Sequence, residues 1–575
     1  MMYLRLASAT LVLAALVAAQ PPPATDPKDL ATLSGKTVST EGQPLKKTAL
    51  SLRSVGGAAG SGLVLQNYTA ISDGQGKFVF EGLQPGRYQL TAERQGYLRQ
   101  NYGSKRSMGV GTILTLSKGE EVKDLTFPLT PHATISGKVL DDDGDPVANA
   151  SVSAMRSDFM NGKRQMMPVG QANSDEGGDY KIGGLAPGRY YLVASKQRGM
   201  FMSDAAPPDA KPGKIEEDLV TTYYPSVTDS SSATPIDTIA GRSAPGTDIR
   251  LRKAQVVRVR GKLVGLLPNQ SMERLRLMLL PSGASMMTSM MTSIGSGSVS
   301  PTKDGSFELT GVPAGSFTLA ATNMQGMIQI LARQQVEVGS QNLDGLVLTM
   351  QTPSDLRGTV KTEGEPKTAP GDAARVAPPS LRVTLRAFEG AMFTPPQGTV
   401  NADGTFVLPN ISPGKYRLSV YGNPDGAYLK AIRLGDRDVL AEGLDLSDGA
   451  SGAVQVIFST AAAEIGGSVQ ADGQPVAAGA VTLVPDPPRP EQTRLYPMSG
   501  VDQNGKFTFK NLAPGKYVVY AWEELEPGAQ YDPEFLKPLE SLGARVTVGE
   551  NGKEQVAVTR ISAATVDEAR QKSGR

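Results

Sequence analysis

The chain has 575 residues, and its 58 Lys and Arg against 57 Asp and Glu give a formal net charge of +1. It contains no Cys and one His, which excludes disulfide frameworks, thiol catalysis and two-histidine metal sites, and leaves a single candidate base for any histidine-dependent triad. The balanced charge supplies no overall field to attract nucleic acid, and we expect a non-catalytic protein without a cofactor.

The N-terminus has the features of an export signal. Arg5 precedes an apolar run from Leu6 to Ala19, which ends in small residues before Gln20. The run is shorter than the roughly 20 residues needed to span a bilayer as a helix. We therefore predict a signal peptide at 1–19, no transmembrane segment in the mature chain, and a periplasmic, cell-surface or extracellular location.

One phrase occurs five times in the remainder of the chain. Its copies are DGQGKFVFEGLQPGRYQL at 73–90, DEGGDYKIGGLAPGRYYL at 175–192, KDGSFELTGVPAGSFTL at 303–319, NADGTFVLPNISPGKYRL at 401–418 and DQNGKFTFKNLAPGKYVV at 502–519. Each copy places an aromatic residue two positions after a turn glycine, and a second aromatic two positions after another glycine. This period of two predicts two antiparallel strands joined at tight turns, and Pro-Gly in four copies predicts a type II turn.

A glycine-containing strand precedes each copy and sets the repeat length. Its glycines are Gly35, Gly137, Gly261, Gly358 and Gly467, and their intervals of roughly 100 residues match the size of an immunoglobulin-like sandwich. We predict an all-β fold of five tandem immunoglobulin- or transthyretin-like β-sandwiches. The expected boundaries are 26–131, 132–254, 255–353, 354–462 and 463–562, with a tail at 563–575.

Helices are expected to be rare. The one predicted helix covers 532–543, where Asp532 caps the start, Pro533 occupies the first turn and Gly543 ends it. Polar or Pro-rich stretches predict loops within modules, and these are 203–217, 281–301, 366–380 and 485–490.

A basic run at 249–262 alternates with apolar residues. Its cations are Arg250, Arg252, Lys253, Arg258, Arg260 and Lys262. One interpretation is a surface for an anionic polysaccharide or a membrane. We favour the other, a solvated strand face whose charges discourage edge-to-edge pairing.

Two further features invite a metal or catalytic interpretation. Asp141, Asp142, Asp143 and Asp145 resemble a calcium loop, but the glycine is misplaced and the closing glutamate is absent, so we favour a hairpin turn over a weak Ca²⁺ site. The single histidine, His132, lies at a repeat boundary and is expected to be a surface residue between modules.

The strand after the second turn shows where the copies differ. Residues in step with the aromatic should face the core, and their neighbours should face outward. The outward set is mostly polar or small in copies 1, 3 and 4, for example Arg417, Ser419 and Tyr421 in copy 4. Copy 5 instead presents Val518, Tyr520 and Trp522. Tyr520 and Trp522 form a candidate aromatic platform for a sugar ring, but we favour the alternative, that the 532–543 helix covers this face with Phe535, Leu536 and Leu539.

These patterns carry a family resemblance. The glycine strand, a Gly-x-Pro turn, the Gly-aromatic strand and L-x-PG-x-Y together resemble the carboxypeptidase regulatory-like domain, a transthyretin-like sandwich grouped with carbohydrate-binding-like folds. The resemblance implies an accessory, non-catalytic module in an exported bacterial protein. We expect a binding protein for polysaccharide or a cell-surface partner; the alternative is a structural spacer or adhesin stalk without a small ligand.

Overall fold

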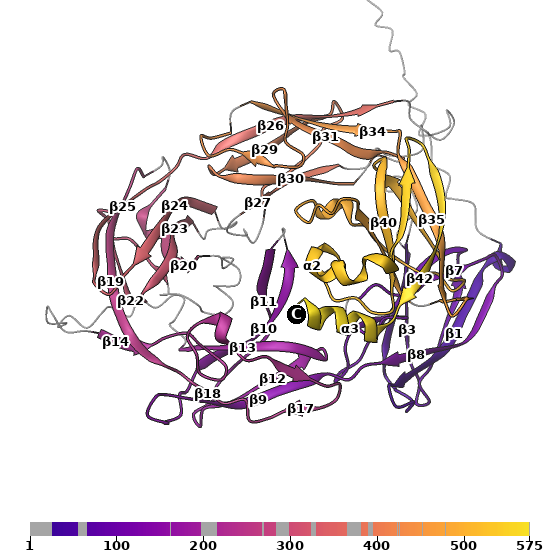
Figure 1. The fold of residues 1–575 in the computed structure, drawn as a ribbon, viewed down its shortest axis with the longest axis horizontal. Helices are drawn as coiled ribbons and strands as arrows, with labels where there is room; N and C mark the ends of the chain where they lie inside the picture. The colour runs from indigo at the N-terminus through magenta and orange to yellow at the C-terminus, as the bar shows by residue number, and fades with distance from the viewer. Residues whose placement is uncertain are drawn as a thin grey trace, which may run out of the picture.

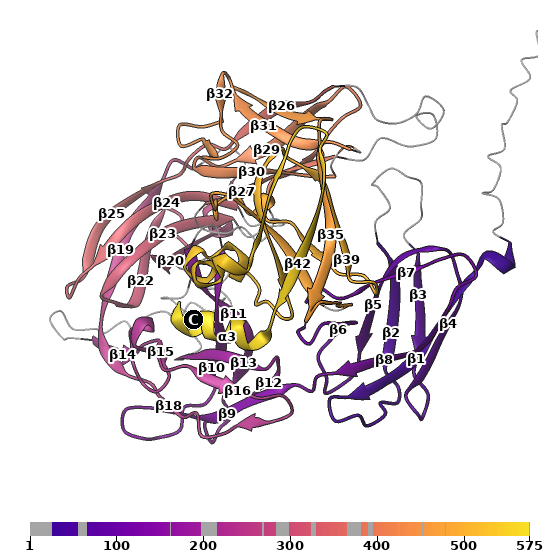
Figure 2. The same ribbon diagram turned by 45° about the vertical axis from the view of Figure 1, so that its right-hand side comes forward.

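The computed structural model describes residues 26–573 apart from 56–65, 108, 161–162, 197–215, 267–269, 283–297, 324–328, 365–380, 389–394, 423, 425, 451 and 478. The predicted signal peptide and most of the loops predicted at 203–217, 281–301 and 366–380 therefore lie outside the described residues. Five β-sandwiches follow one another, and modules 2 to 5 surround a common centre (Figure 1). Module 1 lies beside this ring (Figure 2).

Modules 1 and 2 span residues 31–129 and 133–251. Module 1 contains β1 (Ala31–Ser39), β2 (Ala49–Ser54), β3 (Asn67–Ile71), β4 (Lys77–Leu83), β5 (Gly86–Glu93), β6 (Gln100–Asn101), β7 (Ile113–Leu116) and β8 (Glu121–Leu129). Module 2 contains β9 (Ala133–Leu140), β10 (Ala150–Met160), β11 (Lys163–Asn173), β12 (Asp179–Leu185), β13 (Gly188–Lys196), β15 (Thr222–Tyr223), β16 (Ile236–Thr238), β17 (Ser243–Ala244) and β18 (Ile249–Arg250). β14 (Glu216–Leu219) lies in the same stretch of sequence but joins a sheet of module 3.

Modules 3 and 4 span residues 253–350 and 354–459. Module 3 contains β19 (Lys253–Val264), β20 (Leu275–Pro281), β21 (Ser298–Val299), β22 (Ser306–Pro313), β23 (Gly315–Asn323), β24 (Gln329–Val338) and β25 (Leu343–Thr349). Module 4 contains β26 (Ser354–Glu363), β27 (Arg382–Ala387), β28 (Gln397–Thr399), β29 (Thr405–Ile411), β30 (Lys415–Tyr421), β31 (Tyr428–Leu434), β32 (Arg437–Asp438), β33 (Leu444–Asp445) and β34 (Ala453–Ser459).

Module 5 begins at residue 463 and carries the helices. Its elements are β35 (Ala463–Ala471), β36 (Gln474–Pro475), β37 (Ala480–Pro485), β38 (Met498–Gly500), β39 (Lys506–Leu512), β40 (Gly515–Trp522), α2 (Pro533–Leu536), β41 (Ala544–Val548), β42 (Lys553–Ile561) and α3 (Ala563–Lys572). A 3-10 helix at Lys537–Leu542 extends α2. The all-β fold class is confirmed, with each module built around its own hydrophobic core.

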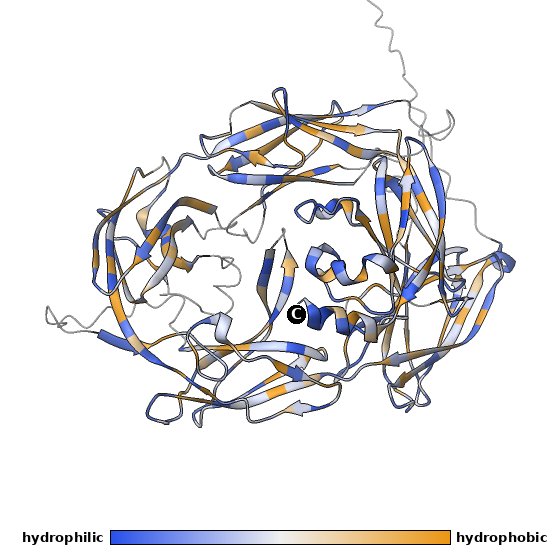
Figure 3. Cartoon of the chain, viewed as in Figure 1, coloured by the Kyte–Doolittle hydropathy of each residue, from blue (hydrophilic) through white to orange (hydrophobic). Residues whose placement is uncertain are grey.

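Alternating side chains explain why these segments are strands. Buried and exposed residues alternate along β4 and β5 of module 1, and Figure 3 shows the same alternation of hydrophobic and hydrophilic residues on strands around the chain. One face of each strand therefore packs into a core while the other faces outward.

The repeated glycine and the repeated aromatic are cross-strand neighbours. Gly35 pairs with Phe78 and Gly467 with Phe507, and the other three copies have the same pairing. A Cβ at Gly467 would lie 1.9 Å from the Val556 carbonyl oxygen and 2.7 Å from the Phe507 ring. The glycine is required because the last strand of the module and the aromatic ring both approach the backbone there.

The predicted hairpin at the Pro-Gly turn is wrong. β4 pairs with β1 in one sheet, whereas β5 pairs with β2 in the other, so Pro-Gly connects the two layers of the sandwich. Gly188 has φ 148°, far from the roughly +80° of a type II turn, and the φ of Gly515 is not positive. Sequence alternation established both strands but carried no information about which sheet each strand joins.

A tyrosine hydroxyl holds this corner in four modules. Tyr88, Tyr190, Tyr416 and Tyr517 each donate to the carbonyl oxygen four residues earlier, over 2.5 to 2.8 Å. Module 3 has Phe317 in this place and Ala-Gly instead of Pro-Gly. The aromatic therefore fills the core and, where it is tyrosine, also satisfies a carbonyl at the corner.

The helices are only partly as expected. Asp532 caps α2 through the backbone N–H groups of Glu534 and Phe535, as predicted. The expected tail at 563–575 instead contains α3, which Ser562 caps and which buries Val566 and Ala569 against module 5. The sequence does not predict α3 because this segment is short and polar. The helix is stabilised by packing against module 5 rather than by a long amphipathic pattern.

Candidate functional site

Module 5 closes on module 1 through backbone and side-chain hydrogen bonds. Ile113 donates its N–H to the Val501 carbonyl over 3.2 Å. The Gln503 side chain both accepts from the Thr115 N–H at 2.9 Å and donates to the Thr115 carbonyl at 2.7 Å. The Thr112 hydroxyl donates to the Ala477 carbonyl at 2.8 Å. These contacts join residues almost 400 positions apart and hold the first and last modules together.

A long hairpin of module 2 makes the second closing contact. β10 and β11 each have 11 residues, and the Arg164 guanidinium near their tip contacts the buried Asp532 carboxylate at 3.0 Å. Arg164 also donates to the Ser573 carbonyl at 2.8 Å. Because Asp532 also caps α2, this ion pair couples the hairpin to the helices that cover module 5.

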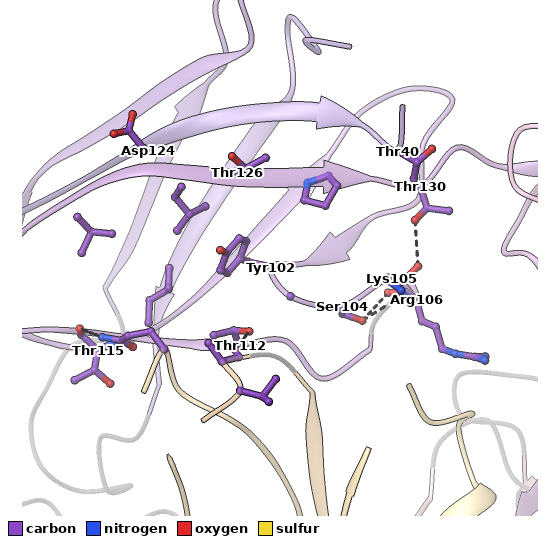
Figure 4. Close-up of a pocket in the computed structure, with 18 of the residues that line it drawn as sticks. Thr40, Tyr102, Ser104, Lys105, Arg106, Thr112, Thr115, Asp124, Thr126 and Thr130 are labelled. Atoms are coloured by element: carbon purple, nitrogen blue, oxygen red, sulfur yellow. Dashed lines mark hydrogen bonds between the residues drawn. The ribbon is translucent and has the colours of Figure 1, made fainter. Parts of the chain in front are cut away.

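The junction of modules 1, 2 and 5 encloses a cleft of about 1350 Å³. Module 1 supplies most of the lining, module 2 adds Ala186 and Pro187, and module 5 adds Val476, Ala477, Gln503 and Glu524. Figure 4 shows hydroxyl-bearing side chains around the opening, with Tyr102 among them. The lining residues with a side-chain hydroxyl group are Thr40, Tyr102, Ser104, Thr112, Thr115, Thr126 and Thr130.

One wall of the cleft is the edge strand β8. β8 lies at the end of the sheet order β4-β1-β8, and Asp124, Thr126 and Pro128 on it line the cleft. Asp124 has φ 59° next to a register shift, and Pro128 has no N–H to donate. A bulge and a proline are features that discourage a further strand from pairing with an edge.

The interior and one end of the cleft differ in polarity. The Tyr102 ring packs edge-on against Phe127 at a centroid distance of 5.5 Å, and burial raises the pKa of Tyr102. At the end nearest module 5, Arg106 lies 3.8 Å from both Glu524 and Glu526. A ligand there would meet an apolar ring, neutral hydroxyls and charges of both signs.

Tyr520 and Trp522 do not form an exposed platform. Trp522 is 0 % exposed and Tyr520 3 %, and both pack with Phe535 of α2. The Trp522 indole N–H donates to the Thr482 hydroxyl at 2.9 Å. The helical segment covers this sheet face because Phe535, Leu536 and Leu539 need an apolar surface, so the platform prediction is corrected in favour of its structural alternative.

The basic run at 249–262 is neutralised by neighbouring carboxylates. Arg258 contacts Glu216 at 2.6 Å and Glu308 at 2.9 Å, and Arg260 shares Glu308 at 3.0 Å. The other pairs are Arg252 with Asp142, Lys253 with Asp143, and Lys262 with Asp304. The interpretation as a surface strand face, rather than an anion site, accounts for these contacts.

The aspartate turn and the histidine have structural roles. Asp141 accepts the N–H groups of Asp143 and Asp145 at 3.0 and 2.9 Å, which closes the turn. His132 lies half-buried between β8 and β9, and burial lowers its pKa. Within the described ranges, no cluster of three or more metal-ligating side chains occurs, and no helix is long and apolar enough to cross a membrane.

Sequence reasoning did not identify the cleft. Its residues come from three modules, and the contacts between modules 1 and 5 leave no signal in local alternation. The one usable clue was the polar segment between β6 and β7, which has no counterpart among the repeated phrases and includes Ser104, Lys105 and Arg106.

Comparison with known proteins supports the repeat assignment. Residues 32–130 and 134–199 match the carboxypeptidase regulatory-like domain, which confirms the expected resemblance as tandem copies over these stretches. No curated protein matches the chain.

Solved structures with matching segments include surface proteins of bacteria. The minor pilin GBS52 of Streptococcus agalactiae is 13% identical, with 42% of this chain and 100% of that chain covered and a TM-score of 0.22. Two B repeat units of the collagen binding protein of Staphylococcus aureus are 12% identical, with 75% and 100% covered and a TM-score of 0.12. The shaft pilin SpaA of Lactobacillus rhamnosus GG is 11% identical, with 42% and 99% covered and a TM-score of 0.19.

Proposed function

Since modules 1 and 2 contain carboxypeptidase regulatory-like domains, we propose that this chain is an exported, non-catalytic binding protein that holds a polysaccharide in the cleft between modules 1, 2 and 5. The observation that carries the proposal is the lining of that cleft. The hydroxyl groups of Thr40, Tyr102 and Thr126 border an opening large enough for several sugar units, and such groups form hydrogen bonds with a hydroxyl-rich ligand.

The edge strand favours a sugar polymer over a peptide that adds as a strand. Peptide addition needs a regular run of backbone donors and acceptors along β8. The bulge at Asp124 and the missing N–H of Pro128 interrupt that run. Tyr102 contributes a ring surface inside the same opening, and rings of this kind pack against sugar faces.

The closed arrangement argues against a linear spacer or stalk. A stalk requires modules that contact only their neighbours, so that the array stays extended. Here the Gln503 and Thr112 hydrogen bonds join module 5 to module 1, and the Arg164 ion pair joins it to module 2. In small-angle scattering, we expect a compact particle instead of a rod.

The test is a retention screen of residues 20–575 on insoluble polysaccharides and a glycan array, with a pair of matched variants. Thr126→Arg places a long cation in the cleft, whereas Val79→Arg adds the same charge on the exposed face of β4, at the opposite edge of the same sheet. We expect Thr126→Arg to lose retention and Val79→Arg to keep it, with both melting temperatures close to that of the parent.

Two results would reject the cleft as the site. One is a parent protein that binds no polysaccharide in either format. The other is retention that Thr126→Arg and Val79→Arg reduce equally, because a specific site must distinguish the two positions.

A further inference from the structure

Two arginines lie directly opposite each other on the outward face of a module 4 sheet. β27 and β30 are antiparallel neighbours, and their register pairs Arg386 with Arg417 and Arg382 with Tyr421. Val383, Leu385 and Leu418 in the intervening positions are buried in the core, so the arginines share the opposite face. Like charges at directly opposed positions destabilise a sheet, which makes an Arg-Arg pair without a carboxylate unusual.

No acidic side chain neutralises this pair in the described part of the chain, where neither arginine makes an ion pair within 4 Å. The Arg417 Nε is buried without a hydrogen-bond partner. Its guanidinium stacks over the Phe388 ring, 4.9 Å from the centroid, and Phe388 itself is 41 % exposed. The pair therefore has an aromatic neighbour and unused donors.

One arginine of module 5 interacts electrostatically with this pair. Burial lowers the pKa of Arg494, and the charge of Arg417 acts in the same direction. Burial likewise lowers the pKa of Arg417.

Tyr517 and then Asp438 oppose the lowering of the Arg494 pKa, and Glu491 opposes that of Arg417. Neither carboxylate forms an ion pair with an arginine in the described part of the chain. Figures 1 and 2 show β27 and β30 on the side of module 4 that faces the ring centre.

We propose that Arg386 and Arg417, the arginine face, bind the anionic groups of an acidic polysaccharide. Guanidinium groups pair with carboxylates and sulfates through two parallel hydrogen bonds. Phe388 and the exposed Tyr421 supply ring surfaces for the sugar between charged groups. This site lies outside the cleft and does not depend on it.

The test measures binding of residues 20–575 to polygalacturonate, dextran sulfate and neutral dextran at low ionic strength. We expect an acidic polymer to bind and neutral dextran not to bind. Preference for polygalacturonate identifies a carboxylate ligand, and preference for dextran sulfate identifies a sulfate ligand. The double variant Arg386→Gln/Arg417→Gln should lower the affinity at least tenfold.

Arg357→Gln is the matched control. Arg357 is an exposed arginine of β26, in the other sheet of module 4, and should keep parental affinity. The proposal fails if neither acidic polymer binds, if Arg357→Gln weakens binding as much as the double variant, or if double-stranded DNA binds equally well, because each outcome indicates no selective site.

Discussion

The basic run on β19 is neutralised by carboxylates, whereas the arginine face on β27 and β30 is not. On β19, Arg258 and Arg260 converge on Glu308, and Glu216 from β14 adds a second carboxylate. On the arginine face, Arg386 and Arg417 oppose each other with no ion pair among the described residues. The sequence displays the first region as an obvious basic run and divides the second between two strands, β27 and β30. A run of cations in the sequence is therefore a poor guide to anion binding. Whether a basic region can bind an anion depends on which carboxylates the fold places beside it.

The largest effect should come from breaking the neutralised region. The Arg258 side chain is only 12 % exposed and contacts Glu216 at 2.6 Å and Glu308 at 2.9 Å. Arg258→Leu removes both ion pairs. We expect a loss of about 1 to 2 kcal/mol in the free energy of unfolding, since unpaired, partly covered carboxylates lose favourable hydrogen bonds. Denaturant unfolding of the parent and the variant measures this loss. An unchanged denaturation midpoint would show that the ion pairs of Arg258 contribute nothing measurable to stability.

A smaller effect should appear as pH falls. Burial alone would raise the pKa of Glu308, but hydrogen bonds from Arg258 and Arg260 outweigh it and the pKa lies below its usual value. A lowered folded pKa contributes stability above the unfolded pKa of about 4.3, and that contribution disappears as pH falls through the folded pKa. Glu308→Gln should therefore be less stable than the parent near neutrality.

Melting temperatures of the parent and Glu308→Gln from pH 6 to pH 3 test this expectation. The gap between them should narrow toward the acid end. A gap that stays constant over the range would show that Glu308 titrates alike in the folded and unfolded chains.

The smallest stability effect is expected on the arginine face. Arg417→Met removes a cation that faces Arg386 and keeps an unbranched chain over Phe388. We expect the free energy of unfolding to change by less than about 0.5 kcal/mol, or to rise, because the lost repulsion offsets the lost ring contact. Unfolding under the conditions used for Arg258→Leu gives a direct comparison. A loss as large as that of Arg258→Leu would show that Arg417 has a structural role.

Local pattern predicted the parts of the fold that depend on neighbours in sequence. The turn glycines before the first aromatic do adopt positive φ, as Gly76 and Gly505 show, and the Asp532 cap begins its helix where expected. Pattern failed where a choice between distant partners was needed. Alternation predicts a hairpin at Pro-Gly, although β4 and β5 join different sheets. Alternation also leaves two interpretations of Trp522 open, and the structure shows that α2 covers this side chain.

The sequence by itself determined five sandwiches, because each copy contains its own alternating strands, its strand glycine and its corner aromatic within about 100 residues. Only the tertiary structure decided how the copies meet. Gln503 contacts Thr115 and Arg164 contacts Asp532 across module boundaries. Such contacts join single side chains from separate repeats, so they leave no period in the sequence, and the cleft depends on them.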